Sequence, residues 1–157
     1  MSVLRIHTAG DPVLKEEAKP VKRIDKKIKR ALKDIADTLY RSKNGIGLAA
    51  PQVGISQRMV VIDLQDGQGL LELINPVITR KEGSQIVSEG CLSVPDFEGE
   101  VERAEYVECE YTDPQGKKQF IAADGLLAIC LQHETDHLDG VLFIDKAVTV
   151  SLKAPEA

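Results

Sequence analysis

The sequence predicts an α+β fold, with antiparallel or mixed sheets around a central helix that carries a His-Glu-x-x-His motif. Short β-like runs gather between residues 58 and 122, whereas the helix-like segments lie on either side, at residues 25–42 and 125–138. A βαβ protein would instead alternate these two patterns along the chain, and the sequence contains no internal repeat. This arrangement favours one mixed domain spanning residues 1–157.

Two helical segments are expected before the strands. Asp11 and Pro12 match an N-cap followed by proline at the first helical position, and they predict a short helix that Pro20 ends. From Asp25 to about Ser42, apolar residues recur at three- and four-residue spacing with charged residues between them. This pattern predicts an amphipathic helix, which is followed by the glycine-rich segment 44–47.

The middle of the chain predicts strands joined by turns, and therefore an antiparallel sheet. The expected strands are residues 58–64, 71–74, 77–80, 85–87, 101–112 and 117–122, with turns at 66–69 and 113–116. Residues 125–138 are almost entirely apolar at their start, which predicts a central buried helix. Gly140 is the expected C-terminal stop of that helix.

Composition limits the classes of protein that this chain can belong to. With 157 residues, 43% of them hydrophobic, the chain can bury a core and a shielded site without disulfides. A net charge of -5 argues against nucleic acid as a substrate, and against DNA as a partner. The basic segment Lys22 to Arg30 is interpreted as a solvated helix face, and a contact with ribosomal RNA is left open.

Localisation and cysteine usage point to a cytoplasmic protein without a membrane partner. The first residues lack the apolar stretch of a signal peptide, and nowhere do about 18 apolar residues run together. The three cysteines are an odd number, so a disulfide framework is not expected. At least one thiol is therefore available for other chemistry.

His133 and His137 carry the clearest chemical signal. Residues four apart on a helix lie on the same face, so both imidazoles can reach one metal ion, and Glu134 can address a metal-bound water. Buried or capping histidines sometimes show the same spacing, so a third ligand is needed. The 20 residues after His137 contain no histidine, which weakens the alternative of a His-Glu-x-x-His metallo-endopeptidase.

Cys91 is the candidate third ligand. It follows a glycine near an expected strand end, where a thiolate could complete a Cys-His-His set and leave one coordination position open. The alternative for Cys91 is a small buried side chain, which is the interpretation of Cys109. Cys130 lies on the same helix face as His133 and could line a pocket, although packing is the favoured interpretation.

The segment from Gly45 to Gln52 is the third signal. It lacks the lysine and the spacing of a phosphate-binding loop. Its small residues would let the backbone pair with an extended peptide, and the Gln52 amide could donate a hydrogen bond to a developing oxyanion. The alternative is a tight turn between a helix and a strand.

Three segments, GIGLAAPQ, EGCLS and QHETDH, closely resemble in this order the signature motifs of peptide deformylases. The resemblance covers nearly the whole chain, through ADGLLAICLQHETDHLDGVLFID. It implies the peptide deformylase fold and removal of the formyl group from the N-terminal formylmethionine of nascent polypeptides, with release of formate. It also implies one divalent metal ion per chain, natively Fe²⁺, with Zn²⁺, Ni²⁺ or Co²⁺ able to substitute. A binding module that keeps the fold without catalysis would require loss of a ligand or of Glu134, and neither is lost.

The resemblance also assigns roles to individual residues. The implied metal ligands are Cys91, His133 and His137, with Glu134 as general acid and base, and Gln52 and the Leu92 backbone amide as oxyanion donors. The implied substrate-binding residues are Ile46, Val87, Leu126, Ile129 and Cys130 in a methionine pocket, and Gly47 and Gly90 in an open peptide channel. Asp136 and Glu89 are placed either to orient a ligand histidine or to pair with an arginine such as Arg103.

The C-terminal segment departs from the family pattern. Family members usually continue with a long basic helix or an apolar tail, whereas residues 145–153 are rich in β-branched side chains and Pro155 would stop a helix. We therefore expect a short form in which that helix is absent or replaced by a strand. The expected partners are formylmethionyl peptides, with at most weak contact with the ribosome.

Overall fold

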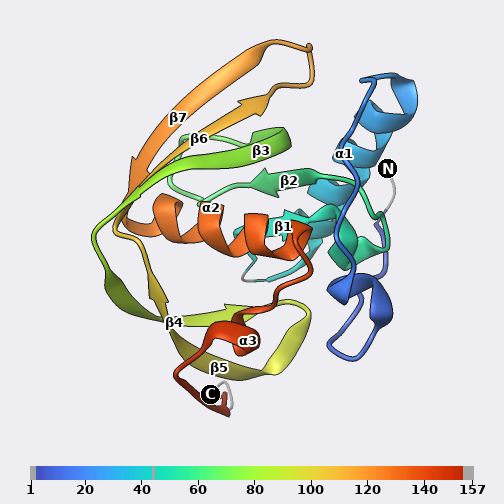
Figure 1. Cartoon of the computed structure of the whole chain (residues 1–157). Coiled ribbons are helices and arrows are strands. Elements are labelled where there is room, and N and C mark those ends of the chain that lie inside the picture. Colours follow the sequence, from blue (N-terminus) through green and yellow to red (C-terminus); the bar gives the residue numbers. More distant parts are fainter. Residues whose placement is uncertain (1–2, 44, 154–157) are drawn as a thin grey trace.

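The structure is a computed structural model that describes residues 3–43 and 45–153. Two sheets and a central helix organise it, and the predicted α+β class is confirmed (Figure 1). In chain order the elements are the 3₁₀ turn η1 (Pro12–Lys15), α1 (Lys26–Arg41), β1 (Gly47–Ala49), the 3₁₀ turn η2 (Ala50–Val53), β2 (Met59–Ile62), β3 (Leu71–Glu82), β4 (Gln85–Cys91), β5 (Val94–Arg103), β6 (Tyr106–Thr112), β7 (Lys118–Asp124), α2 (Gly125–Leu138), α3 (Phe143–Lys146) and β8 (Thr149–Leu152).

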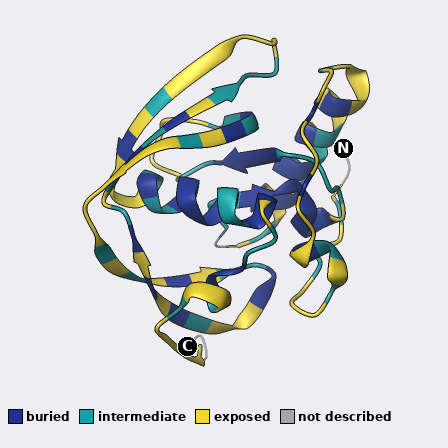
Figure 2. Cartoon of the chain, viewed as in Figure 1, coloured by how far each residue is buried: buried dark blue, intermediate teal, exposed yellow. Residues whose placement is uncertain are grey.

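Helix α2 lies between the two sheets. The larger sheet has the strand order β1-β2-β3-β6-β7, the smaller has the order β4-β5-β8, and the neighbouring strands pair antiparallel. Figure 1 shows α2 with the larger sheet on one side and the β4 and β5 strands on the other. Figure 2 shows buried residues along much of α2 and along β2, so the main core lies between this helix and the larger sheet.

The two long helices begin and end where local sequence signals place them. Asp25 caps α1 by accepting a hydrogen bond from the Ile28 amide at 3.0 Å, and Ser42 follows its last residue. The apolar stripe that includes Leu32 and Leu39 is buried against β1 and β2. At the end of α2, Gly140 adopts a left-handed φ of 76°, as expected for its role as a stop.

Several shorter elements differ from the expectations. The helix after Asp11 is a single 3₁₀ turn that ends at Lys15, because Glu16 is already extended, with ψ at 147°. The two runs at residues 71–74 and 77–80 form one strand, β3, which is interrupted by a register shift where Asn75 adopts a φ of 52°. The run at residues 101–112 divides instead into β5 and β6, which belong to different sheets.

The segment after Gly140 forms a short helix and a strand. Helix α3 is a single turn, and β8 adds to the smaller sheet by pairing residues Thr149 to Leu152 with β5. The expected replacement of a C-terminal helix by a strand is thus observed for residues 149–152, while Pro155 lies outside the described residues. Within residues 3–43 and 45–153, no helix combines the length and apolar character needed to cross a membrane.

Candidate metal centre and active site

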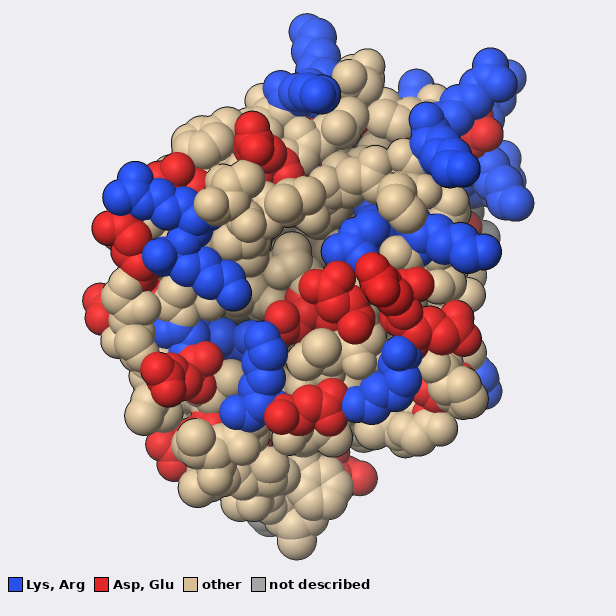
Figure 3. Space-filling model, viewed as in Figure 1, with Lys and Arg blue, Asp and Glu red and all other residues tan. Residues whose placement is uncertain are grey.

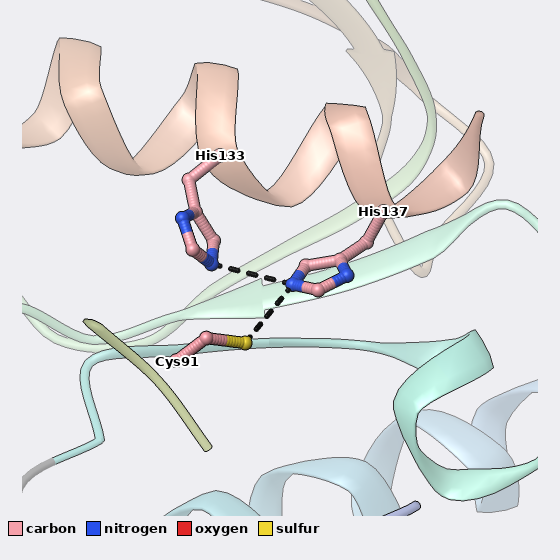
Figure 4. Close-up of side chains that lie close together, drawn as sticks. All are labelled: Cys91, His133 and His137. Atoms are coloured by element: carbon pink, nitrogen blue, oxygen red, sulfur yellow. Dashed lines mark hydrogen bonds between the residues drawn. The ribbon is translucent and has the colours of Figure 1, made fainter. Parts of the chain in front are cut away.

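Three possible metal ligands converge from two elements (Figure 4). Cys91 is the last residue of β4, and His133 and His137 lie one turn apart on α2. The distance from Cys91 Sγ to His137 Nε2 is 3.3 Å, and the two histidine Nε2 atoms are 3.2 Å apart. All three donor atoms lie within 4.8 Å of one another. The residues that the sequence places 42 and 46 positions apart are therefore neighbours in the fold.

The donor set fits a divalent metal ion. Cys91 Sγ and His133 Nε2 lie 3.3 and 3.2 Å from His137 Nε2, and a divalent cation would accept a lone pair from each of these three atoms. Burial lowers the pKa of His137 well below its ordinary value, and the charges of His133 and Arg103 act in the same direction. His137 is thus held in the neutral form that binds metals. A soft thiolate with two imidazoles suits several first-row divalent ions.

Glu134 lies beside the three possible ligands, and one of its carboxylate oxygens is available to accept a hydrogen bond. Its side chain is buried, and among the described residues no group hydrogen-bonds its Oε1 atom. Burial raises the pKa of Glu134 to about 7; the positive charges of His133 and Arg103 oppose this shift, whereas the carboxylate of Glu89 adds to it. A carboxyl group with a pKa near neutrality can both accept and return a proton.

Gln52 faces the cysteine from the turn η2. Its Oε1 atom accepts a hydrogen bond from the Ala49 amide at 2.9 Å, which orients the side-chain amide. Its Nε2 atom consequently lies 3.1 Å from Ser93 Oγ and 3.5 Å from Cys91 Sγ. For the segment from Gly45 to Gln52, the sequence left two interpretations, a peptide-binding loop and a tight turn. In the structure this segment contains the short strand β1, and the turn η2 follows it. A donor amide therefore points at Cys91, one of the three possible metal ligands.

Glu89 and Arg103 form a buried layer behind His133. Glu89 Oε1 lies 2.8 Å from His133 Nδ1, and Arg103 donates to both Glu89 oxygens at 2.7 and 2.9 Å. Burial alone would raise the pKa of Glu89, but hydrogen bonds from Arg103 and His133 lower it to about 2. Asp136 accepts from Arg103 at 2.6 Å. Glu89 therefore fills both roles that the sequence left open, whereas Asp136 pairs with the arginine.

A cavity of about 480 Å³ opens beside these groups. Most of the residues expected to bind substrate line it, namely Ile46, Gly47, Gly90, Leu126, Ile129 and Cys130, together with Gln52 and Leu92. Val87 is not among the lining residues; it lies half-buried in β4 and pairs with Val101. Further lining residues to which the sequence gave no substrate-binding role include Lys43, Gly45, Phe97 and Lys153. Gly45 begins the GIGLAAPQ motif. Lys43, Phe97 and Lys153 come from segments without a motif, so no sequence pattern could have identified them.

The three cysteines have different environments. Burial raises the pKa of Cys130 to about 12, and the carboxylates of Glu134 and Glu89 add to the shift. Burial likewise raises the pKa of Cys109 to about 11. Both side chains remain thiols near neutral pH, which agrees with the packing interpretation, although Cys130 also lines the cavity. Cys91 is the cysteine that lies among the imidazoles.

Comparison with known proteins agrees with this geometry. Residues 3–153 match the polypeptide deformylase family. The chain is 53% identical over 151 residues to a peptide deformylase of Desulfitobacterium hafniense, which covers 96% of this chain and 99% of that protein. It is also 48% identical over 156 residues to a peptide deformylase of Pelotomaculum thermopropionicum, covering 99% of each.

Solved structures give the same result. The structure resembles the peptide deformylase of Thermotoga maritima with a TM-score of 0.90 and 40% identity, covering 95% of this chain and 100% of that chain. The match to a peptide deformylase of Synechococcus elongatus in complex with actinonin has a TM-score of 0.88 and 49% identity, covering 93% and 79%. Sequence and fold thus agree over nearly the whole length, and the chain belongs to the peptide deformylase family.

Proposed function

We propose that this chain acts as a single catalytic domain that removes the formyl group from N-terminal formylmethionine and releases formate. The observation that carries the proposal is the convergence of Cys91, His133 and His137 within 4.8 Å, beside the cavity that Glu134 also lines. Each residue needed for metal-assisted amide hydrolysis is present, so a non-catalytic binding module is not favoured. The metallo-endopeptidase alternative is weakened because the 20 residues after His137 contain no histidine that could serve as its third ligand.

The side chains divide the reaction between them. A divalent ion held by Cys91, His133 and His137 would supply positive charge that polarises the formyl carbonyl and acidifies water. Glu134 takes the proton from the attacking water and returns it to the leaving amine, for which its raised pKa is suited. Gln52 Nε2 and the Leu92 backbone amide donate hydrogen bonds to the oxygen on which negative charge develops.

The methionine side chain is proposed to occupy the apolar part of the cavity. Ile46, Leu126, Ile129 and Cys130 line it, and the thiol of Cys130 stays uncharged. Removing an unbranched thioether side chain from water stabilises the bound peptide by roughly 1.5–3 kcal/mol. Val87 is not assigned to this pocket, because it lies outside the lining residues.

We further propose Fe²⁺ as the native ion, with Zn²⁺, Ni²⁺ or Co²⁺ able to replace it. One thiolate and two imidazoles accept all four ions, so availability in the cell selects among them. Metal analysis of protein purified without oxygen tests this assignment. Stoichiometric iron is the expected result, and zinc as the main metal in such a preparation would contradict it.

The proposed setting is the cytoplasm, with formylmethionyl peptides as partners and only a weak, salt-sensitive contact with the ribosome. Basic side chains gather over α1 at the upper right of Figure 3, and Lys26, Lys29, Arg30 and Lys33 are exposed along that helix. The net charge of -5 disfavours DNA as a partner, and no membrane partner is proposed. Ribosome co-sedimentation that persists at high salt would contradict a weak electrostatic contact.

Replacing Glu134 tests the proposed chemistry. Glu134→Gln should keep the bound metal, because Glu134 is not a ligand, and should reduce turnover about 100- to 10,000-fold. Formate release from formyl-Met-Ala and metal content are the measurements, and Glu110→Gln on the exposed part of β6 is the matched control. Turnover within a few-fold of the parent enzyme would exclude the assigned role. Cleavage of an internal peptide bond without formate release would instead support the endopeptidase.

A further inference from the structure

Arg103, the last residue of β5, is a buried arginine that the proposed chemistry does not use. Its side chain is 2% exposed, and it does not line the cavity. It makes three hydrogen bonds to carboxylates of two other elements, Glu89 of β4 and Asp136 of α2. Burying a guanidinium is unfavourable unless its donors are paired in good geometry, so this arrangement requires both carboxylates.

The contact with Glu89 determines how His133 can face a metal. An ionised carboxylate only accepts hydrogen bonds, so the 2.8 Å contact with Glu89 places the proton of His133 on Nδ1. In the neutral imidazole, the form that binds a metal, the lone pair is then on Nε2, the atom that faces His137. Arg103 donates through Nε to one Glu89 oxygen and through Nη2 to the other, which fixes the plane of the carboxylate.

The contact with Asp136 joins the elements that carry the ligands. Cys91 is on β4 and both histidines are on α2, so the distance between them depends on how the strand packs on the helix. Arg103 binds Glu89, two residues before Cys91, and Asp136, one residue before His137. Lys146 of α3 holds the other oxygen of Asp136 at 3.1 Å. The ion pairs made by Arg103 and by Lys146 thus connect β4, β5, α2 and α3.

We propose that Arg103 is a positioning residue for the metal centre, which orients Glu89 toward His133 and holds the cysteine-bearing strand against the histidine-bearing helix. The proposal rests on the proposed function only in assuming that the three ligands bind a divalent ion. Loss of the guanidinium leaves Glu89 with only His133, and Asp136 with only Lys146, as side-chain partners, and removes the connection between the two carboxylates. A group that orients a ligand in this way typically changes metal affinity by about 10- to 100-fold.

Arg58, the residue before β2, offers a matched control because it also contacts α2. Its guanidinium braces the end of α2 by donating to the Leu138 carbonyl at 3.1 Å and to Asp139 at 2.9 Å, and its side chain is 18% exposed. It contacts neither a ligand residue nor Glu89 among the residues that the structure describes. Arg58→Met therefore removes an arginine that stabilises α2 without touching the orientation of His133.

The test uses the full chain loaded with Co²⁺. For Arg103→Met, Arg103→Lys and Arg58→Met, we would record the visible spectrum of Co²⁺, its rate of loss to a chelator, the melting temperature, and KM and kcat for formyl-Met-Ala. Arg103→Met should change the visible spectrum of Co²⁺ and speed Co²⁺ loss about 10- to 100-fold. It should also lower kcat, with a smaller effect on KM. Arg103→Lys should lie between it and the parent, because an ammonium cannot make the bidentate contact. Arg58→Met should lower the melting temperature and leave the spectrum unchanged.

Two further outcomes separate positioning from general stability. Millimolar guanidinium chloride, but not sodium chloride, should slow Co²⁺ loss from Arg103→Ala. If Arg103→Met does not fold, the same measurements on Arg103→Lys and the parent protein test the proposal. An unchanged spectrum and a Co²⁺ loss rate within twofold of the parent in the folded Arg103 variants would overturn the proposal, as would equal effects in Arg58→Met. Failure of the parent enzyme to release formate would contradict the proposed function and leave the Co²⁺ results interpretable.

Discussion

At the scale of single residues, the site depends on a close approach between Gly47 and Glu134. A Cβ atom built on Gly47 would lie 2.7 Å from Glu134 Oε2. That contact is too short, so one of the two groups would have to move. The Glu134 atom is the end of a flexible side chain, which moves more easily than backbone. The glycine is therefore required by the position of the Glu134 carboxylate, the proposed general acid and base.

Gly47→Ala should displace Glu134 without unfolding the protein. A displacement of about 1 Å at a catalytic group costs roughly 100-fold in rate, so kcat for formyl-Met-Ala should fall by that order while the melting temperature stays nearly constant. Gly90→Ala provides the contrast, because a Cβ there lies 4.0 Å from the nearest atom, the Phe97 carbonyl oxygen. It should change KM more than kcat. A full kcat in Gly47→Ala would show that Glu134 has another productive position.

At the scale of elements, strand β8 depends on a glycine in its neighbour. Gly99 of β5 pairs with Val150 of β8. A Cβ on Gly99 would lie 2.7 Å from the Thr149 carbonyl oxygen and 3.0 Å from Ala147 Cβ. Backbone atoms held in a sheet cannot yield as a side chain does. The packing of β8 on β5 therefore requires the absence of a side chain at this position.

Gly99→Ala should weaken the attachment of β8. Overpacking of this kind typically destabilises a protein by about 1–3 kcal/mol, so urea unfolding should shift to lower concentration. Hydrogen exchange should increase in β8 more than in α2. Since the proposed metal ligands lie on β4 and α2, kcat should remain within a few-fold of the parent. Equal protection of β8 in both proteins would contradict this account.

At the scale of the whole molecule, the proposed metal ligands connect elements that are separated in sequence and belong to different layers. Cys91 ends a strand of the smaller sheet, whereas both histidines lie on the helix that packs against the larger one. A bound ion stabilises the folded chain because the unfolded chain does not hold the three ligands together. The free energy of unfolding should thus depend on metal.

Chelation should lower the melting temperature of the protein. A ligand present at a thousand times its dissociation constant stabilises the native state by about 4.1 kcal/mol, which is a shift of several degrees or more in a domain of this size. Differential scanning calorimetry with and without a chelator measures it. Cys91→Ser should melt at nearly the same temperature in both conditions, because an alkoxide forms far less readily than a thiolate. A large metal-dependent shift in Cys91→Ser would return Cys91 to a packing role.

The features predicted from sequence are those with local causes. Asp25 and Ser42 delimit α1 because capping involves residues within one turn, and the apolar run that begins at residue 125 predicted all of α2. Strands were predicted less well. β1 was not expected, β3 was divided in two, and β5 and β6 were joined, because a strand is defined by partners far away in the chain.

The sequence by itself determined the fold class, the family resemblance and the chemical types of the candidate ligands, since these follow from side-chain periodicity and motif spacing. Only the tertiary structure decided that Cys91 Sγ lies 3.3 Å from His137 Nε2, and that Arg103 pairs with both Glu89 and Asp136. It also brought Phe97 and Lys153 into the cavity lining and left Val87 outside it. Such contacts join residues distant in the chain, so they depend on how strand β4 packs against helix α2, and no local pattern encodes that packing.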